Sequence, residues 1–274
     1  MKVVLFCGGQ GLRMREASAV LPKPMVSVGG RPILWHVMKY YAHYGHTDFI
    51  LCLGYKGEAI KQYFLNYNEA LANDFVLSGG GAKVDLLRTD MHDWKISFVD
   101  TGQNAVIGER LAAVRHLLDG EETFLAHYGD VLTDAHLPTM IDRARATNAA
   151  ASFLCVRPNF SFHLVSHDED GQVRNITDVL RSDIWINGGF FILRSEFFDH
   201  LGPHEDLVGE PLQRLVDAGR VFAQRHEGFW APMDTLKDNQ LLESLHAGGN
   251  APWQVWEMAG ASPAPNAERI LSAA

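Results

Sequence analysis

The chain has 274 residues, of which 47% are hydrophobic, and carries a formal net charge of −9 at pH 7. This length suits one large α/β domain or two small ones with a sizeable core. The acidic charge argues against nucleic acid or an anionic membrane as the general partner, and no apolar run approaches the length of a membrane span. We therefore expect a globular protein that binds neither nucleic acid nor membrane.

Three cysteines, Cys7, Cys52 and Cys155, each fall in a predicted buried strand. An odd number without paired spacing indicates reduced thiols, which are typical of the cytoplasm. The apolar run at residues 3–7 is too short to be the core of a signal peptide. We expect a cytoplasmic protein whose cysteines act as small buried apolar residues.

The first predicted strand, residues 2–7, ends at Gly8, Gly9 and Gly11. Three glycines in four positions let the backbone turn tightly and bring its N–H groups against an anion. Arg13 and Lys23 place cations beside this turn. A plain turn is the alternative, but a strand, a glycine turn and nearby cations together favour a phosphate-binding loop.

Two familiar phosphate loops do not fit this segment. A dinucleotide-binding fingerprint, G-x-G-x-x-G, would need a third glycine where Met14 stands, and a Walker loop would need Gly-Lys-Ser/Thr at its end. The loop therefore belongs to another type.

Strand and helix patterns alternate through the next part of the chain. Pro32 begins a predicted helix that extends to about Tyr44, with apolar residues at helical spacing. Strands that alternate with helices predict parallel βαβ units, and strands without a polar face predict a sheet covered on both sides. The predicted fold class is α/β, a Rossmann-like, mostly parallel sheet with helices on both faces. Further strands are expected at residues 48–53, 95–99, 123–127 and 151–156, and further helices at 57–67, 109–118 and 137–146.

Two segments depart from this alternation. Residues 68–95 hold two short strand-like runs around Gly79-Gly-Gly81, which predict an inserted hairpin or flexible loop. Residues from about 158 to 230 mix short strands with helices and form a smaller part. We expect one domain at residues 1–247, followed by a tail at 248–274 whose final dozen residues are loosely ordered.

Several chemical groups follow predicted strands. Thr101 and Gly102 follow one strand, and Gly129 and Asp130 follow another. Ligands of parallel α/β sheets collect at these carboxyl ends, and a buried carboxylate needs a partner. Mg²⁺ is the simplest partner, because it binds a few carboxylates together with water and substrate phosphates. We expect Asp130 and Asp234 to hold it, although Asp234 alone is also a favoured helix N-cap.

Together these motifs resemble the sugar-1-phosphate nucleotidyltransferases, and among them the glucose-1-phosphate cytidylyltransferases. The resemblance extends from residue 1 to about 246 in a single order, and it implies the nucleotidyltransferase fold for the domain at 1–247 and an acceptor-binding part at about 158–230. Its motifs are Gly-Gly-x-Gly-x-Arg at 8–13, Pro-Lys-Pro at 22–24, Trp-Ile-Asn-Gly-Gly-Phe-Phe at 185–191 and Gly-Phe-Trp-x-Pro-Met-Asp-Thr at 228–235, with further matches at 29–36, 48–57, 99–102 and 128–130.

The resemblance implies that a phosphorylated acceptor attacks the α-phosphate of a nucleoside triphosphate, CTP above all, and releases pyrophosphate. Arg13 would hold the β- and γ-phosphates, Lys23 the α-phosphate, and Asp130 with Asp234 the Mg²⁺. The chain departs from the family at Glu109, where a glycine is usual. The implied nucleotide-binding residues are Gly8, Gly9, Gly11, Arg13, Lys23, Thr101, Gly102, Arg110 and Gly129.

The acceptor side departs further from the family. Where the family carries Glu-Lys before the Trp-Ile-Asn-Gly-Gly segment, this chain has Asp178 and Val179, and a valine cannot hold a phosphate. His163 stands where the family has a small residue and would crowd a hexose. These changes predict an acceptor other than glucose 1-phosphate, with Arg181 or Arg157 as the missing cation; alternatively, Arg181 simply replaces the lysine. The expected acceptor-binding residues are His163, Asp178, Arg181, Asn187 and Gly188.

Two other classes of protein remain as alternatives. A glycosyltransferase of similar architecture usually holds its metal with Asp-x-Asp, whereas Leu132 lies two residues after Asp130. A binding protein that lost activity is the other alternative, and the retained Arg13, Lys23 and carboxylates argue against it.

In the resembling family the excursion at 68–95 reaches a neighbouring subunit, which implies a homo-oligomer.

Overall fold

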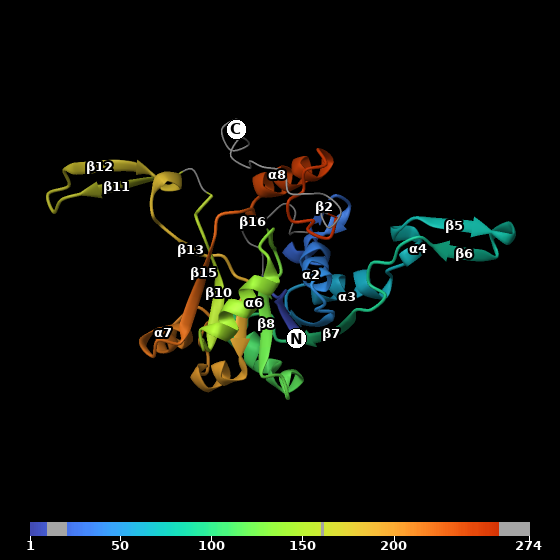
Figure 1. Ribbon diagram of the computed structural model, residues 1–274, viewed down its shortest axis with the longest axis horizontal. Coiled ribbons are helices and arrows are strands. Elements are labelled where there is room, and N and C mark those ends of the chain that lie inside the picture. The colour runs from blue at the N-terminus through green and yellow to red at the C-terminus, as the bar shows by residue number, and fades with distance from the viewer. Residues whose placement is uncertain (10–20, 160–161, 258–274) are drawn as a thin grey trace.

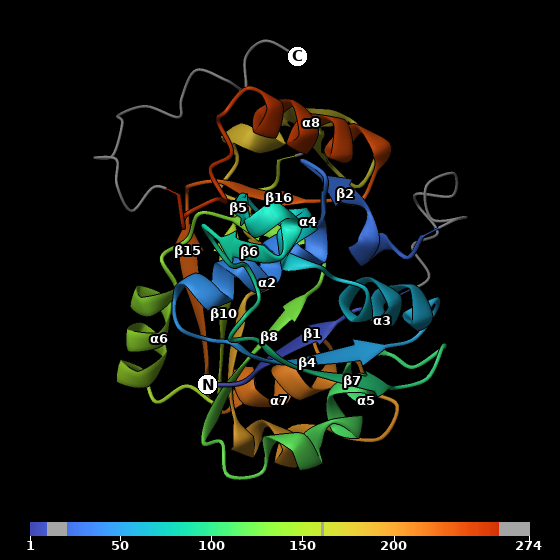
Figure 2. The ribbon, with the colours of Figure 1, turned by 90° about the vertical axis from the view of Figure 1, so that its right-hand side faces the viewer.

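A central β-sheet organises the computed structural model, which describes residues 1–9, 21–159 and 162–257. Its innermost strand β1 (Val3–Phe6) is buried at every position, as expected of a parallel sheet that is covered on both faces. Figure 2 shows α2 (Ile33–His43) and α3 (Gly57–Leu65) on one side of β1, and α5 (Ile107–Ala113) and α7 (Glu210–Asp217) on the other. The predicted α/β fold class is confirmed.

The parallel core of the sheet has the order β8–β1–β4–β7. Beyond β8 lies β14, which is antiparallel to both β8 and β10, and β15 pairs in parallel with the outer side of β10. The carboxyl ends of the parallel strands therefore meet along one edge of the sheet. The remaining strands of this sheet are β4 (Asp48–Leu53), β7 (Lys95–Asp100), β8 (Thr123–Tyr128), β10 (Ala151–Val156), β13 (Ile186–Asn187), β14 (Phe191–Arg194) and β15 (Val221–His226).

The two faces of the sheet carry separate apolar clusters. Val3 and Leu5 point into the cluster beneath α2, and Val4 and Phe6 point into the cluster beneath α5 and α7, as the two-residue period of a strand requires. Helix α6 (Leu137–Ala146) and helix α8 (Leu236–Ala247) contribute buried residues to the first cluster. The segment predicted as one helix at 109–118 is instead α5 followed by the 3₁₀ turn Arg115–Leu118.

The insertion at residues 68–95 contains a hairpin, as predicted, preceded by the short helix α4 (Glu69–Ala72). Its strands β5 (Phe75–Ser78) and β6 (Lys83–Leu86) are exposed along their whole length. The hairpin projects from one end of the molecule (Figure 1). A two-stranded ribbon is marginally stable by itself, so its position depends on contacts at its base.

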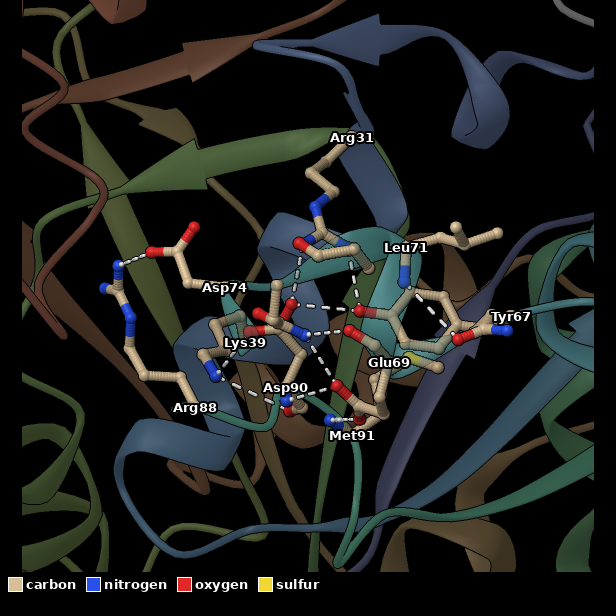
Figure 3. Close-up of polar contacts among 12 residues, drawn as sticks. Arg31, Lys39, Tyr67, Glu69, Leu71, Asp74, Arg88, Asp90 and Met91 are labelled. Carbon is tan, nitrogen blue, oxygen red and sulfur yellow. Dashed lines mark hydrogen bonds and ion pairs between the residues drawn. The ribbon is translucent and has the colours of Figure 1, made fainter. Parts of the chain in front are cut away.

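An ion-pair cluster holds that base (Figure 3). The guanidinium of Arg31 donates to Asp90 Oδ2 at 2.7 Å, to Tyr67 Oη at 2.7 Å and to the Ala72 carbonyl at 2.6 Å. Lys39 Nζ lies 3.4 Å from the other oxygen of Asp90. Because Arg31 and Lys39 come from the body and Ala72 and Asp90 from the insertion, the cluster joins the two.

A second hairpin projects from the opposite end of the molecule (Figure 1), formed by β11 (His163–His167) and β12 (Val173–Asp178). The sequence predicted only a mixture of short strands and helices here. The whole of β11 is exposed, so neither of its faces packs against a core. The alternation of apolar and polar residues that usually predicts a strand is therefore missing.

The core extends past the boundary expected at residue 247. Trp253 is 1% exposed, and its indole Nε1 donates to His36 Nδ1 at 3.3 Å. Trp256 packs edge-on against Trp35 with 5.9 Å between ring centroids. The segment at 248–257 is therefore part of the domain, because its two indoles cover apolar surface of α2.

Burial leaves two histidines uncharged, and this predicts an acid-sensitive fold. His127 has no exposed surface and packs on Phe190; burial lowers its pKa from 6.5 to about 3, and burial also lowers the pKa of His36 to about 4. Below about pH 6.5, and down to about pH 3 for His127 and pH 4 for His36, the unfolded chain takes up protons that the folded chain excludes. The free energy of unfolding therefore falls as the pH is lowered, by about 1.4 kcal/mol per pH unit for each histidine within its range.

His127→Leu should reduce this loss. Denaturant unfolding from pH 7 to pH 4.5 measures it, with the exposed His116→Leu as the matched control. A variant whose stability depends on pH as steeply as the wild type would contradict the assignment to His127.

Candidate active site

A cavity of about 720 Å³ opens at the carboxyl ends of the parallel strands. Its walls include Gly8 and Gly9 after β1, Asp130 after β8, and Asp234 just before α8. The 3₁₀ turn Lys23–Met25 forms part of one side of it. The fold thus brings together residues that are more than 200 positions apart in the sequence.

Lys23 lies between the two carboxylates at the centre of this cavity. Its Nζ is 2.5 Å from Asp130 Oδ2 and 2.5 Å from Asp234 Oδ1. Burial disfavours the charged amine, but the attraction of Asp130 and the hydrogen bonds to both carboxylates outweigh it and raise the pKa of Lys23. The side chain is therefore a fixed ammonium ion near neutral pH.

Backbone pairing fixes the distance between the carboxylates. The strands β9 (Val131–Thr133) and β16 (Trp230–Pro232) are antiparallel, with Val131 opposite Pro232. The Met233 N–H donates to the Asp130 carbonyl at 2.9 Å. These contacts place Asp130 and Asp234 on neighbouring segments of the chain.

The alternative N-cap role of Asp234 does not apply. Thr235 is the N-cap of α8, and its hydroxyl accepts from the Asp238 N–H at 3.2 Å while the Asp238 carboxylate accepts from the Thr235 N–H at 2.7 Å. This reciprocal capping box satisfies the helix end. The carboxylate of Asp234 instead accepts a hydrogen bond from Lys23 in the cavity.

The chemistry of these donors suits a hard divalent cation. Two carboxylates already converge on a positive charge, that of Lys23. In the part of the chain that the structure describes, no group of three or more His, Cys, Asp or Glu side chains converges as a complete metal site. A cation held here would thus take its other ligands from water or substrate phosphates, as Mg²⁺ commonly does.

Arg110 ties together the loops on the nucleotide-facing side of the cavity. Its guanidinium donates to Leu53 O at 3.1 Å, Thr101 Oγ1 at 2.8 Å and Gly102 O at 2.8 Å, and to Gly8 O at 3.1 Å. Burial lowers its pKa, and none of these acceptors is a carboxylate. The guanidinium lines the cavity, and its positive charge favours an anionic ligand there.

Two glycines have structural reasons that differ from the prediction. A Cβ at Gly8 would lie 2.1 Å from Arg110 Nη1, so Gly8 lets the guanidinium approach. Gly129 was expected among the nucleotide-binding residues, and a Cβ there would lie 3.3 Å from Cys7 Sγ and 3.4 Å from the Phe6 carbonyl oxygen. The space beside Gly129 is filled by the end of β1.

Glu109, the departure from the family on the nucleotide side, points away from the cavity. Its carboxylate accepts from the Val106 N–H at 3.0 Å and from His204 Nδ1 at 2.6 Å. These contacts lower its pKa, the backbone hydrogen bond most of all. Glu109 therefore caps the start of α5 and does not crowd the cavity.

The predicted acceptor residues divide into two groups. Asn187 Nδ2 donates to Tyr128 Oη at 3.4 Å, and the Gly188 carbonyl accepts from Trp230 Nε1 at 2.9 Å, so both contact the cavity wall. His163 and Asp178 instead face each other at the base of the β11–β12 hairpin. Arg181 is exposed at the end of the adjoining 3₁₀ turn.

The carboxylate of Asp178 does not reach the cavity. Its Oδ1 accepts from the Leu180 N–H at 3.0 Å and caps the 3₁₀ turn Val179–Arg181.

Conversely, Asp206 lines the cavity although it was not predicted. It lies in an irregular loop with no motif, so only the tertiary structure identifies it. Gly11 and Arg13 lie outside the described residues.

Comparison with known proteins identifies the class of this site. A model of the family "Nucleotidyl transferase" matches residues 2–244. A glucose-1-phosphate cytidylyltransferase of Salmonella typhi is 39% identical over 259 residues, covering 94% of this chain and all of that protein. A mannose-1-phosphate guanyltransferase of Candida albicans is 24% identical and covers 87% of this chain and 62% of its own length.

Among solved structures, the UTP-bound UGPase from Acinetobacter baumannii aligns with a TM-score of 0.67 at 21% identity, covering 94% of this chain and 96% of that one. This likeness shows a shared α/β fold. The chain belongs to the nucleotidyl transferase family, among the sugar-1-phosphate nucleotidyltransferases. The resemblance and the enzyme class predicted from the motifs are confirmed. Within the described residues, no helix has the length and apolar character needed to cross a membrane.

The contact between Gly8 and Arg110 predicts a large effect of an added methyl group. Gly8→Ala should displace the guanidinium and weaken nucleotide binding by about tenfold or more, since several charge-assisted hydrogen bonds depend on it. Gly209→Ala, outside the cavity wall, is the control, because the nearest atom to a Cβ there would be the Asp206 carbonyl oxygen at 3.8 Å. Calorimetric titration with CTP measures both, and equal affinities would contradict the role of Gly8.

Proposed function

We propose that this protein is a cytidylyltransferase that joins CTP to a sugar 1-phosphate and releases pyrophosphate. The observation that carries the proposal is the convergence of Lys23, Asp130 and Asp234 in one cavity of a chain 39% identical to a glucose-1-phosphate cytidylyltransferase over its whole length. The choice of CTP and of a sugar phosphate comes from that relative's name.

Asp130 and Asp234 would hold Mg²⁺ in this proposal. Bound there, Mg²⁺ would neutralise charge on the triphosphate and on the departing pyrophosphate. With the carboxylates engaged by a metal, the ammonium of Lys23 would be able to bind the α-phosphate. Arg13, which lies outside the described residues, remains the proposed partner of the β- and γ-phosphates.

The chain's residues act by positioning and by charge stabilisation. An oxygen of the acceptor phosphate attacks the α-phosphorus, a new P–O bond forms, and the bond to the β-phosphate oxygen breaks with its electron pair leaving on pyrophosphate. Lys23 neutralises the charge that develops on the α-phosphate oxygens in this step. Arg110 holds Gly8, Thr101 and Gly102 in place, and we propose that their backbone groups surround the nucleotide.

We also propose that the enzyme is a cytoplasmic homo-oligomer. The support is the resemblance, in which the excursion at 68–95 reaches a neighbouring subunit, and the apolar exposure of the β5–β6 hairpin. Phe75, Val76 and Leu77 are each at least 41% exposed, as expected of a surface that a partner covers.

The metal assignment predicts a large effect at Asp130. Asp130→Asn removes a metal ligand and leaves Lys23 with one carboxylate, so kcat should fall by about two to three orders of magnitude. Asp48→Asn, at an exposed ion pair with Lys95, is the control. Turnover with saturating Mg²⁺ close to that of the wild type would make the assignment wrong.

A pyrophosphate-release assay with glucose 1-phosphate and each of CTP, UTP, GTP, ATP and dTTP tests the activity and the base preference. We expect CTP to give the highest kcat/KM. A higher value with UTP or dTTP would overturn the choice of base, and no release with any triphosphate and several sugar phosphates would overturn the proposed reaction.

A further inference from the structure

Two arginines and a tryptophan cluster at the acceptor end of the sheet. The guanidinium carbons of Arg157 and Arg225 lie 4.8 Å and 5.0 Å from the centroid of the Trp185 ring. Arg157 follows β10, Arg225 belongs to β15, and Trp185 precedes β13. We call these three residues the arginine–tryptophan cluster.

The cluster has an excess of positive charge. Arg157 donates to the Ser182 carbonyl at 2.5 Å and lies 3.7 Å from Asp183 Oδ1. The same carboxylate oxygen accepts from Trp185 Nε1 at 3.2 Å. Arg225 is exposed and has no carboxylate partner in the described part of the chain. The cluster thus contains two guanidinium groups and one carboxylate, which among the described residues pairs with Arg157 alone, in a chain whose net charge is −9.

Strand register connects the cluster to the cavity. Cys155 pairs with Asn187 on one side and with Arg225 on the other. Paired residues share a face, and so do residues two apart along a strand, so Arg157, Arg225 and Trp185 lie on the face that carries Asn187. Asn187 contacts Tyr128, which lines the cavity. The cluster therefore continues the cavity wall away from Asp130.

The position of the cluster suits the far end of an acceptor that is bound along Asn187. Asn187 and Arg225 are two strand spacings apart, roughly 10 Å between Cα atoms. A sugar whose reacting phosphate lies at Lys23 would extend along Asn187 toward the cluster. Glucose 1-phosphate has only hydroxyl groups at that end, and these do not require two guanidinium groups.

We propose that the acceptor carries a second anionic group, at the end remote from its reacting phosphate, and that Arg225 and Arg157 bind it. This inference rests on the proposed function. The planar guanidinium binds phosphate or carboxylate through paired hydrogen bonds. Stacking on Trp185 holds the guanidinium groups in place before the ligand arrives, which reduces the entropy lost on binding. Asp178 and Arg181, at the hairpin base, are not needed for it.

The test compares acceptors that differ only in the second group: glucose 1-phosphate, glucose 1,6-bisphosphate and glucuronic acid 1-phosphate, each with saturating CTP and Mg²⁺. We expect one of the two doubly anionic compounds to exceed glucose 1-phosphate in kcat/KM by about tenfold to a hundredfold. Which of them is preferred distinguishes a phosphate from a carboxylate. Equal or lower values for both would overturn the proposal.

Variants separate this site from the reaction centre. Arg225→Gln should remove the preference for the doubly anionic compound and leave kcat/KM for glucose 1-phosphate within about twofold, while Arg225→Lys, which keeps the charge, should retain part of the preference. Arg174→Gln, at an exposed ion pair on β12, is the matched control. An unchanged preference in Arg225→Gln would overturn the assignment to Arg225.

A binding measurement keeps the inference distinct from the proposed reaction. Calorimetric titration of the wild type and Arg225→Gln with glucose 1,6-bisphosphate and glucuronic acid 1-phosphate, in the presence of α,β-methylene CTP, needs no turnover. Tighter binding by the wild type of either compound would support the site even if no pyrophosphate were released. Equal binding of both compounds by the two proteins would overturn it.

Discussion

The ion pair of Lys23 with Asp130 and Asp234 is the contact on which the site depends. It joins the segment after the first strand, the end of β8 and the start of α8, which share no local sequence relationship. Two carboxylates this close to one point would repel each other without a cation, and a partly buried ammonium would be unstable without them. The attraction between the ammonium and the two carboxylates therefore holds the segments together. The carboxylates also suit a metal ion, and the ammonium suits a polyphosphate.

The nucleotide side of the cavity is built from the interior of the sheet. Arg110 is 4% exposed and bonds to carbonyls after β1 and β4 and to the loop after β7. A buried guanidinium that contacts three consecutive strand ends makes these loops move as a unit, and the absence of a Cβ at Gly8 is what allows the contact. A substitution of Arg110 or Gly8 would disturb the core, so we expect little sequence variation at these positions.

The acceptor side has a different construction. Its candidate groups lie at the outer strands β10, β13 and β15 and at the base of the exposed β11–β12 hairpin. Side chains there, such as Arg225, can change without opening a cavity in the core. This difference in burial gives a physical reason why the residues expected to bind the nucleotide match the family's motifs while those expected to bind the acceptor depart from them.

The sequence by itself determined the α/β class and the alternation of strands and helices, and it predicted the glycine, lysine and aspartate positions of the proposed nucleotide site. These follow from local patterns: apolar runs of strand length, helical spacing after Pro32, and motifs contiguous in the chain. It also predicted the inserted hairpin from short strand-like runs around Gly79-Gly-Gly81.

Only the tertiary structure decided the rest. The caps formed by Thr235 and Asp178 are local, but the sequence pattern alone did not choose Thr235 over Asp234 as the cap of α8 or assign Asp178 to a turn. That Cys7 fills the space beside Gly129, and that Trp253 belongs to the core, depend on contacts between segments distant in sequence. The same holds for Asp206 in the cavity and for the pairing that brings Arg157, Arg225 and Trp185 together. A local pattern states which conformation a segment prefers, but the partner of a buried polar group is set by strand register and packing across the whole chain.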